Sequence, residues 1–149
     1  MKRSQRLEPV VKVAENREQQ AAKALGEAQA ALQQAQQRLA ELKTYREEYV
    51  QRFHSDGATG MSAVQMGDYR LFLSKLSRAI EQQAELVEQA AARLEQQRQQ
   101  WFDQRGKVKM LGNVVSRFQA DERRSVERRE QREQDERSQG RPSATKHTS

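Results

Sequence analysis

Residues 54–65, HSDGATGMSAVQ, decide the fold, because they are the one clear break in a chain otherwise rich in helix formers. The first half of this stretch collects small, polar and glycine residues, which mark a turn. The second half, Ser62-Ala63-Val64-Gln65, has the spacing of a capping box, in which a serine and a glutamine satisfy each other's backbone amides at a helix start. We therefore expect one turn, at residues 55–61, that joins two long helices.

The composition supports helices and argues against sheet. Gln, Arg, Ala and Glu make up half of the 149 residues, only 35% of the chain is hydrophobic, and the mean hydropathy is −1.09. This composition excludes an ordinary compact core. We expect a single domain over residues 1–139, with a first helix over about 9–54 that starts near Pro9 and a second helix over about 62–137. Residues 140–149 are expected to form a disordered tail.

Both expected helices carry a heptad repeat, whose apolar core positions are called a and d. In the second helix the a positions are Met66, Leu73, Ile80, Val87, Leu94, Trp101, Val108 and Val115. Its d positions are Tyr69, Leu76, Gln83, Ala90, Gln97, Gln104, Leu111 and Phe118. In the first helix the d positions are Leu7, Ala14, Ala21, Ala28, Ala35, Leu42 and Tyr49, and the a positions are Val11, Leu25, Leu32, Leu39 and Phe53, interrupted by Glu18 and Arg46. The repeat predicts a coiled coil.

Folding the chain back at the turn aligns the two seams. In an antiparallel coiled coil an a residue faces a d residue, and here the numbers of facing residues sum to about 122. Large residues then face small ones, as Trp101 faces Ala21 and Leu94 faces Ala28, which fills a core without voids. The predicted fold class is all-α, a long two-helix antiparallel coiled-coil hairpin with an overhanging C-terminal helix past about Phe118. A parallel dimer of the second helix is the alternative, and it would stack three glutamines on their copies.

The residues needed for catalysis or metal binding are missing. The chain has no cysteine and two histidines, His54 in the expected turn and His147 in the expected tail, and it has no glycine-rich phosphate-binding loop. No apolar run approaches the roughly 20 residues of a membrane-spanning helix, and no signal peptide is recognisable. We expect a non-enzymatic cytoplasmic protein that needs no cofactor or metal and acts through its surface.

Positive charge gathers toward the C-terminus. Residues 105–141 carry eleven basic and seven acidic groups, within a net charge of +6 for the whole chain. A DNA-binding helix has cations with few acids between them, whereas the acids here are interleaved. We therefore expect a solvated, charged helix and no nucleic-acid partner.

One edge near the turn is more apolar than expected. Position g flanks the seam and is usually polar, yet it holds aromatic and aliphatic residues close to the turn on both helices. With neighbouring seam residues, and interrupted by Arg46, they form a distal patch: Leu42, Tyr45, Tyr49, Phe72, Leu76, Ala79 and Leu86. Exposed aromatic residues commonly anchor an interface. The distal patch is therefore either a binding site for a partner or a widened part of the core.

Several motifs of the chain match one known family. They are Leu7-x-x-Val10-Val11-x-x-Ala14-Glu15 and Leu25-Gly26-Glu27 in the first helix, Leu42-x-x-Tyr45-x-x-x-Tyr49 before the turn, and Tyr69-x-x-Phe72-x-x-x-Leu76-x-x-Ala79 after it. In these motifs, and in Trp101, the chain resembles the FliJ family, coiled-coil hairpins of the bacterial flagellar type III export apparatus. The likeness covers roughly residues 4–135.

The resemblance implies a structural role at the cytoplasmic face of the inner membrane, which the protein reaches only peripherally through partners. FliJ-like hairpins look like the central stalk of rotary ATPases, insert their open end into the export ATPase ring, present the other end to the export gate, and escort export chaperones. Carried over to this chain, the gate contacts are Leu42, Tyr45, Tyr49, Phe72, Leu76 and Ala79. The ATPase contacts are Arg105, Lys107, Lys109, Arg117, Arg123 and Arg124, with the termini.

Two other functions fit the same residues. One is the equivalent stalk of a virulence type III secretion injectisome, whose sequence pattern is the same as that of the flagellar protein. The other is a generic coiled-coil scaffold or adaptor, for which the apolar residues of the distal patch would only serve packing.

Overall fold

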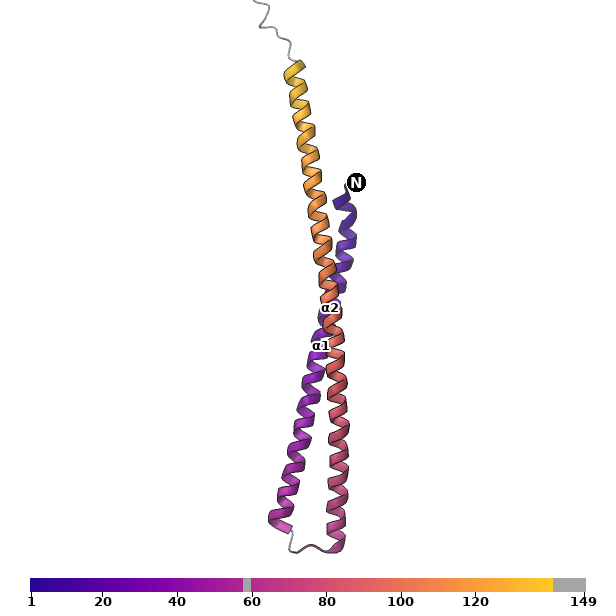
Figure 1. Cartoon of the computed structure of the whole chain (residues 1–149), viewed down its shortest axis with the longest axis vertical. Helices are drawn as coiled ribbons and strands as arrows, with labels where there is room; N and C mark the ends of the chain where they lie inside the picture. Colours follow the sequence, from indigo (N-terminus) through magenta and orange to yellow (C-terminus); the bar gives the residue numbers. More distant parts are fainter. Residues whose placement is uncertain (58–59, 141–149) are drawn as a thin grey trace, which may run out of the picture. The chain divides into compact units, whose positions relative to one another are not determined.

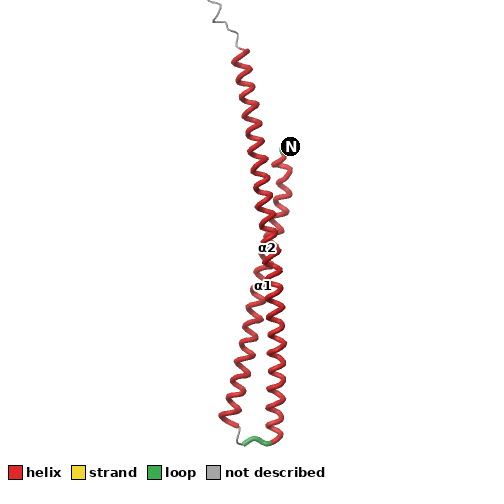
Figure 2. The backbone as a smooth tube through the Cα atoms, viewed as in Figure 1, coloured by secondary structure: helices red, strands yellow, loops and turns green. Residues whose placement is uncertain are grey.

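The computed structural model of the chain describes residues 1–57 and 60–140, without the side chain of Asp56. It contains helix α1 (Arg3–Arg52), a short π-helical turn η1 (Phe53–Gly57) and helix α2 (Ala63–Gly140), as Figure 1 shows. The described residues contain helices and loops and no strand (Figure 2). The fold class is therefore all-α, a helical hairpin, as the heptad pattern predicts.

The start of α1 lies earlier than expected. We expect Pro9 near the first turn, but α1 begins at Arg3 and carries Pro9 at its seventh position, where its side chain is exposed. Lys2 donates its backbone N–H to Gln5 Oε1 (3.3 Å), and Arg6 donates to the Lys2 carbonyl (3.1 Å). The first helical turn is thus capped locally, and Ser4 in this turn also forms hydrogen bonds with α2. Together these contacts stabilise the start of α1 although proline disfavours a helix.

The turn between the helices is built largely as predicted. Ser62 donates its N–H to Gln65 Oε1 (3.0 Å), and Gln65 donates its N–H to Ser62 Oγ (3.2 Å), so the predicted capping box is confirmed. Helical conformation continues past the expected end of the first helix, because η1 extends to Gly57. At the other end α2 reaches Gly140, which we placed in the tail, and the rest of the expected tail, residues 141–149, lies outside the described residues.

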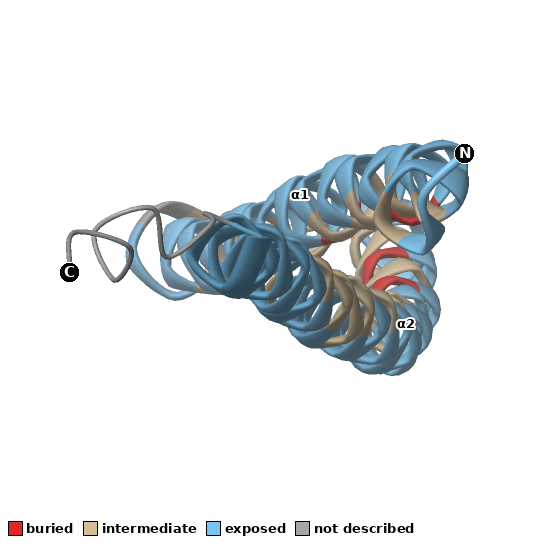
Figure 3. Ribbon diagram, turned by 90° about the horizontal axis from the view of Figure 1, so that it is seen from above, coloured by how far each residue is buried: buried red, intermediate tan, exposed pale blue. Residues whose placement is uncertain are grey.

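The helices pack in two units. The turn unit comprises Gln19–Asp103, and the terminal unit comprises Met1–Glu18 with Gln104–Ser149, of which residues up to 140 are described. In each unit the buried and half-buried residues of one helix face the other helix (Figure 3). Each unit is therefore a short stretch of two-helix coil with a narrow core.

The predicted seam is confirmed in both units. Every a and d residue of α2 from Met66 to Phe118 is buried or half-buried, and so is every a and d residue from Leu7 in α1 to Phe53 in η1 except Arg46. The most completely buried residues are two alanines, one leucine and one glutamine: Ala14, Ala28, Leu76 and Gln83. Small and large residues are both among them, as expected of a seam in which large residues face small ones.

Contacts between the helices agree with the predicted register. In the turn unit Phe53 stacks on Tyr69 with ring centroids 3.8 Å apart, and these two residues were expected to face each other. Arg46 donates from Nε to Ser77 Oγ (3.2 Å) two layers further on. In the terminal unit the guanidinium of Arg3 lies 5.7 Å from the ring centre of Phe118. The antiparallel pairing therefore holds at both places.

Gln83 explains how a polar residue is accommodated in the seam. Its side chain is only 7% exposed, and Nε2 donates to the carbonyl oxygen of Ala35 at 3.0 Å. The small side chain of Ala35 leaves room for this contact, and the buried amide gains a partner that a larger residue would block. The Gln83 bond is specific to one register, because a shift along the seam would leave the amide buried without an acceptor.

Two variants at Gln83 should show how its hydrogen bond and its volume each affect the free energy of unfolding. The free energy of unfolding of the Gln83→Leu variant should lie within about 1 kcal/mol of the parent's, because the Ala35 carbonyl keeps its helical hydrogen bond and Leu fills the space. The Gln83→Ala variant should lose about 1–3 kcal/mol, because it leaves a cavity. Thermal unfolding followed by circular dichroism measures both, and a larger loss for Gln83→Leu than for Gln83→Ala would contradict this interpretation.

Candidate partner-binding surfaces

The aromatic residues next to the turn form one continuous cluster in the turn unit. Tyr49 lies between Phe72 (ring centroids 4.5 Å apart) and Tyr69 (5.2 Å), and Tyr69 stacks on Phe53. Tyr45 meets Phe72 edge to face at 6.1 Å. Aromatic pairs at these separations attract each other beyond their apolar burial. The five rings, from two helices, therefore hold one another in place.

The residues of this cluster differ in how far they are exposed. Tyr45 is 47% exposed and lies outermost, whereas Tyr49 and Phe72 are half-buried. Of the other expected gate contacts, Leu42 and Ala79 are half-buried and Leu76 is in the core. The two interpretations of the distal patch thus apply to different residues, since Leu76 is in the core whereas Tyr45 and Leu86 are exposed.

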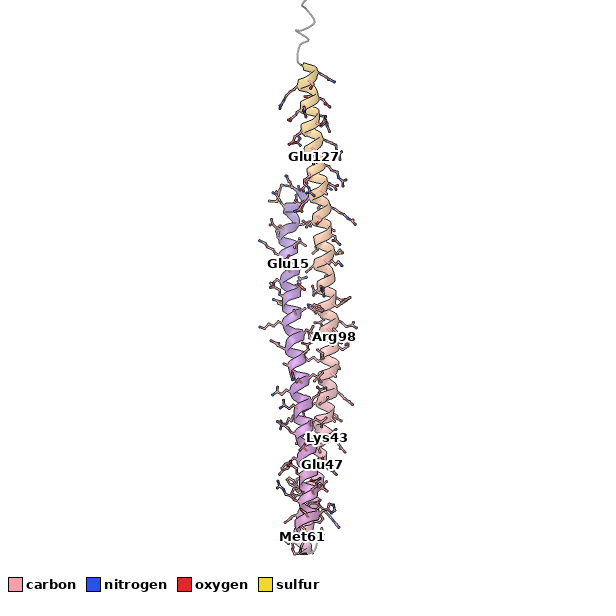
Figure 4. All side chains as sticks on the ribbon, turned by 90° about the vertical axis from the view of Figure 1, so that its left-hand side faces the viewer. Glu15, Lys43, Glu47, Met61, Arg98 and Glu127 are labelled. Atoms are coloured by element: carbon pink, nitrogen blue, oxygen red, sulfur yellow. The ribbon has the colours of Figure 1, made fainter. Side chains whose placement is uncertain are left out.

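The apolar edge extends away from the turn along α2. Leu86 occupies the g position two turns past Ala79 and is 51% exposed. On the opposite edge of the turn unit, Lys43, Glu47 and Ser77 line a shallow groove with Arg46 and Ile80 (Lys43 and Glu47 are labelled in Figure 4). The turn unit therefore has one aromatic edge and one polar edge.

Sequence reasoning missed some exposed apolar residues of the turn unit. Val64, Leu71 and Phe102 are 74%, 56% and 69% exposed, and none belongs to the distal patch. Their heptad positions, f for Val64 and Leu71 and b for Phe102, point away from the seam, and this signal was available in the sequence. Isolated exposed apolar residues are common on protein surfaces, so these three do not by themselves indicate a site.

The six basic residues expected to contact an ATPase are all exposed and lie in the terminal unit. The structure does not gather them on one edge. Lys107, Arg117 and Arg124 occupy g and c positions, while the other three, Arg105, Lys109 and Arg123, occupy e and b positions on the other side of the seam. Arg124 pairs with Asp121 at 3.7 Å, an exposed contact of small energetic weight.

The start of α1 is held to α2 by two hydrogen bonds, which we call the N-terminal clasp. Ser4 donates its N–H to Glu122 Oε1 (3.1 Å) and its hydroxyl to Glu122 Oε2 (2.8 Å). A carboxylate at this place satisfies one of the free amides of a helix N-terminus and complements the helix dipole. Glu122 was not singled out from the sequence, because its partner lies 118 residues away.

The clasp changes the acidity of Glu122. The Ser4 hydroxyl, then the Ser4 amide and the charge of Lys2, lower the pKa of Glu122 below the usual glutamate value, against a smaller opposing effect of desolvation. Next to the clasp, Val11, Val115 and Val126 line a groove with polar rims at Glu8 and Arg123. The clasp thus closes one side of a shallow, partly apolar groove in the terminal unit.

Residues 1–57 and 60–140 contain no group of three or more metal-ligating side chains. None of the described helices is long and apolar enough to span a membrane.

Comparison with known proteins gives one result. The family model described as "Flagellar FliJ protein" matches residues 2–146, which is nearly the whole chain. No curated protein and no solved structure matches. The family match covers the motifs on both sides of the turn that carry the resemblance in the sequence.

Lowering the pH should loosen the first turn of α1. Because the pKa of Glu122 is lowered in the folded chain, the clasp contributes fully above the ordinary glutamate pKa of about 4.3 and is lost as the pH falls through the lowered pKa. Amide hydrogen exchange of residues 3–8, corrected for the intrinsic pH dependence, should therefore lose protection in acid. The Glu122→Gln variant should already be less protected at pH 7, and an unchanged acid response in this variant would contradict the role of Glu122.

Proposed function

The chain belongs to the flagellar FliJ family, and from this premise we propose that it is a non-enzymatic stalk of the flagellar type III export apparatus, linking the export ATPase ring to the export gate. The family makes it a component related to flagellar protein export. The finer role rests on the chemical contrast between the two units, one with an aromatic edge and one with exposed basic side chains. A linking protein needs two such dissimilar surfaces.

The aromatic edge of the turn unit supports the gate contact. Tyr45 is exposed, its ring contacts Phe72, and Phe72 in turn packs on Tyr49. A rigid aromatic side chain loses little conformational entropy on binding and buries a large apolar area, which is why such residues dominate binding energies. In the gate contact Tyr45 and Phe72 are the anchors, Leu42, Tyr49 and Ala79 form the rim, and Leu76 supports them from the core.

The terminal unit supports the ATPase contact. Beyond Glu122 every described residue of α2 is exposed, so a long stretch of helix is available to a partner. The a and d positions of this stretch are polar or charged, so it does not continue the apolar seam. A contact made there depends on charge, and the basic residues that precede and begin this stretch supply it.

Chaperone escort and location at the inner membrane are parts of the same proposal. Both come from the family, and a chain that binds the ATPase and the gate would be held at the cytoplasmic face of the membrane. The match to a flagellar family model favours the flagellar system over an injectisome.

Two variants of the full chain test the two surfaces. Tyr45→Ala should weaken binding to the purified cytoplasmic domain of the export gate by about 2 kcal/mol, the scale of an interface anchor, while barely changing the helical melt. The matched control is Leu71→Ala, because Leu71 is also exposed in the turn unit but lies outside the distal patch.

The second variant combines Arg117→Gln, Arg123→Gln and Arg124→Gln. It should weaken binding to the export ATPase, and the parent's binding should decline with salt, because exposed charges are screened within about 10 Å at 0.1 M ionic strength. Binding to the gate should be unaffected. The opposite pattern, with gate binding lost and ATPase binding kept, would show that the two surfaces are assigned to the wrong partners.

A further inference from the structure

The terminal unit has two edges of very different charge. Over residues 3–17 and 107–124, the g and c positions of both helices carry six cations, three on each helix, and a single acid: Arg3, Arg6, Arg17, Lys107, Arg117, Arg124 and Asp121. The e and b positions over the same residues carry three cations and two acids: Lys12, Lys109, Arg123, Glu8 and Glu15 (Glu15 is labelled in Figure 4). We call the g and c side the basic edge.

Contacts in the terminal unit support the assignment of both edges. In an antiparallel coil the g positions of the two helices share one side of the seam and the e positions share the other. Arg3 and Asp121, both at g, line one surface depression together with Phe118. Glu8, Gly112 and Gln119, all at e, line the groove beside the N-terminal clasp. The two helices therefore contribute jointly to each edge.

Apolar side chains lie among the cations of the basic edge. Val10, Val13 and Met110 are 47%, 51% and 57% exposed, and Val114 is half-buried beside them in the heptad order. The acid on this edge, Asp121, is paired with Arg124 at 3.7 Å. Six cations and this one acid give the edge a net charge of +5. The whole pattern fits within a helix length of about 20 Å on α1.

We propose that the basic edge of the terminal unit binds directly to the surface of an anionic lipid bilayer. Clusters of Lys and Arg near a helix attract acidic headgroups, and apolar side chains between them enter the boundary of headgroups and acyl chains. Long Arg and Lys side chains keep their charges at the headgroups while their stems cover apolar surface. The basic edge includes Lys107, Arg117 and Arg124, which the proposed ATPase contact also uses, so the bilayer and the ATPase compete for these residues. The bilayer contact does not rest on the proposed stalk function.

The apolar residues distinguish a bilayer from a nucleic acid. A phosphate backbone would be bound by the six cations alone, and Val10, Val13 and Met110 would then have no role. At a bilayer these three side chains leave water on binding, which adds a contribution that salt does not screen. These three side chains are few and already partly buried, so their contribution alone is small. The binding is therefore reversible and needs both the charges and the apolar residues.

Two triple variants with the same change in net charge test the proposal. The edge variant carries Arg6→Glu, Lys107→Glu and Arg117→Glu. The control variant carries Lys12→Glu, Lys109→Glu and Arg123→Glu, which takes one residue from α1 and two from α2, as the edge variant does. Each is tested as the full chain for co-sedimentation with vesicles of phosphatidylcholine containing 30% phosphatidylglycerol (roughly the anionic share that such a contact requires). Circular dichroism verifies that both variants remain helical.

The parent should bind these vesicles and not vesicles of phosphatidylcholine alone. The edge variant should lose binding on the order of a hundredfold, at roughly a fivefold loss for each of the three cations removed, and the control variant should lose much less. A double variant with Val13→Ser and Met110→Ser should bind more weakly and with a steeper salt dependence than the parent.

Three results would overturn the proposal. The first is no binding of the parent to anionic vesicles, and the second is an equal loss in the edge and control variants, which would indicate net charge alone. The third is tighter binding to a short DNA duplex than to the vesicles, with no effect of the Val13→Ser and Met110→Ser changes, which would identify the edge as a phosphate-backbone site.

Discussion

The size-matched seam between α1 and α2 is the constraint on which the other features depend. A two-helix coil has a single layer of contacts, so a mismatch in one layer cannot be compensated from a second side. The alanines of α1 leave room for larger residues of α2, and Ala14 and Ala28 are among the most buried residues of the seam. In the turn unit the same pairing brings Tyr45 onto Phe72, and in the terminal unit it brings Ser4 onto Glu122.

Polar residues inside the seam show that stability alone does not determine its sequence. Gln83 is buried with a hydrogen bond to Ala35, whereas Oε1 of Gln104 is buried and accepts no hydrogen bond within residues 1–57 and 60–140. Glu18, the residue expected to face Gln104, is half-buried. Each of these groups costs desolvation energy, and each disfavours shifted registers, in which a buried polar group would face apolar seam residues.

The sequence predicts the elements whose causes are local or periodic. The capping box at Ser62 and Gln65 depends on four neighbouring residues, and the seam depends on a repeat, so both follow from inspection. The start of α1 does not, because its first turn is stabilised by Glu122, far away in the chain. The distal patch predicted from the sequence includes Leu76, but in the structure Leu76 lies in the core and not on the surface. The six expected ATPase contacts share a positive charge, but their heptad positions divide them between two edges. Heptad positions follow from the sequence, so this division is also predictable from it.

The most direct test of the hairpin is a pair of cysteines across the seam. Ala28→Cys with Leu94→Cys places two thiols in facing core positions, and oxidation should cross-link them within one chain, giving a faster-migrating monomer on a non-reducing gel. Ala30→Cys with Ala92→Cys is the matched control, because these alanines lie at the same level but are exposed at f positions, on the outer sides of the two helices. The account predicts an intramolecular cross-link for the first pair and none for the second. A disulfide-linked dimer formed as readily by Leu94→Cys alone, with no intramolecular product from the pair, would contradict the hairpin and indicate a parallel dimer of α2.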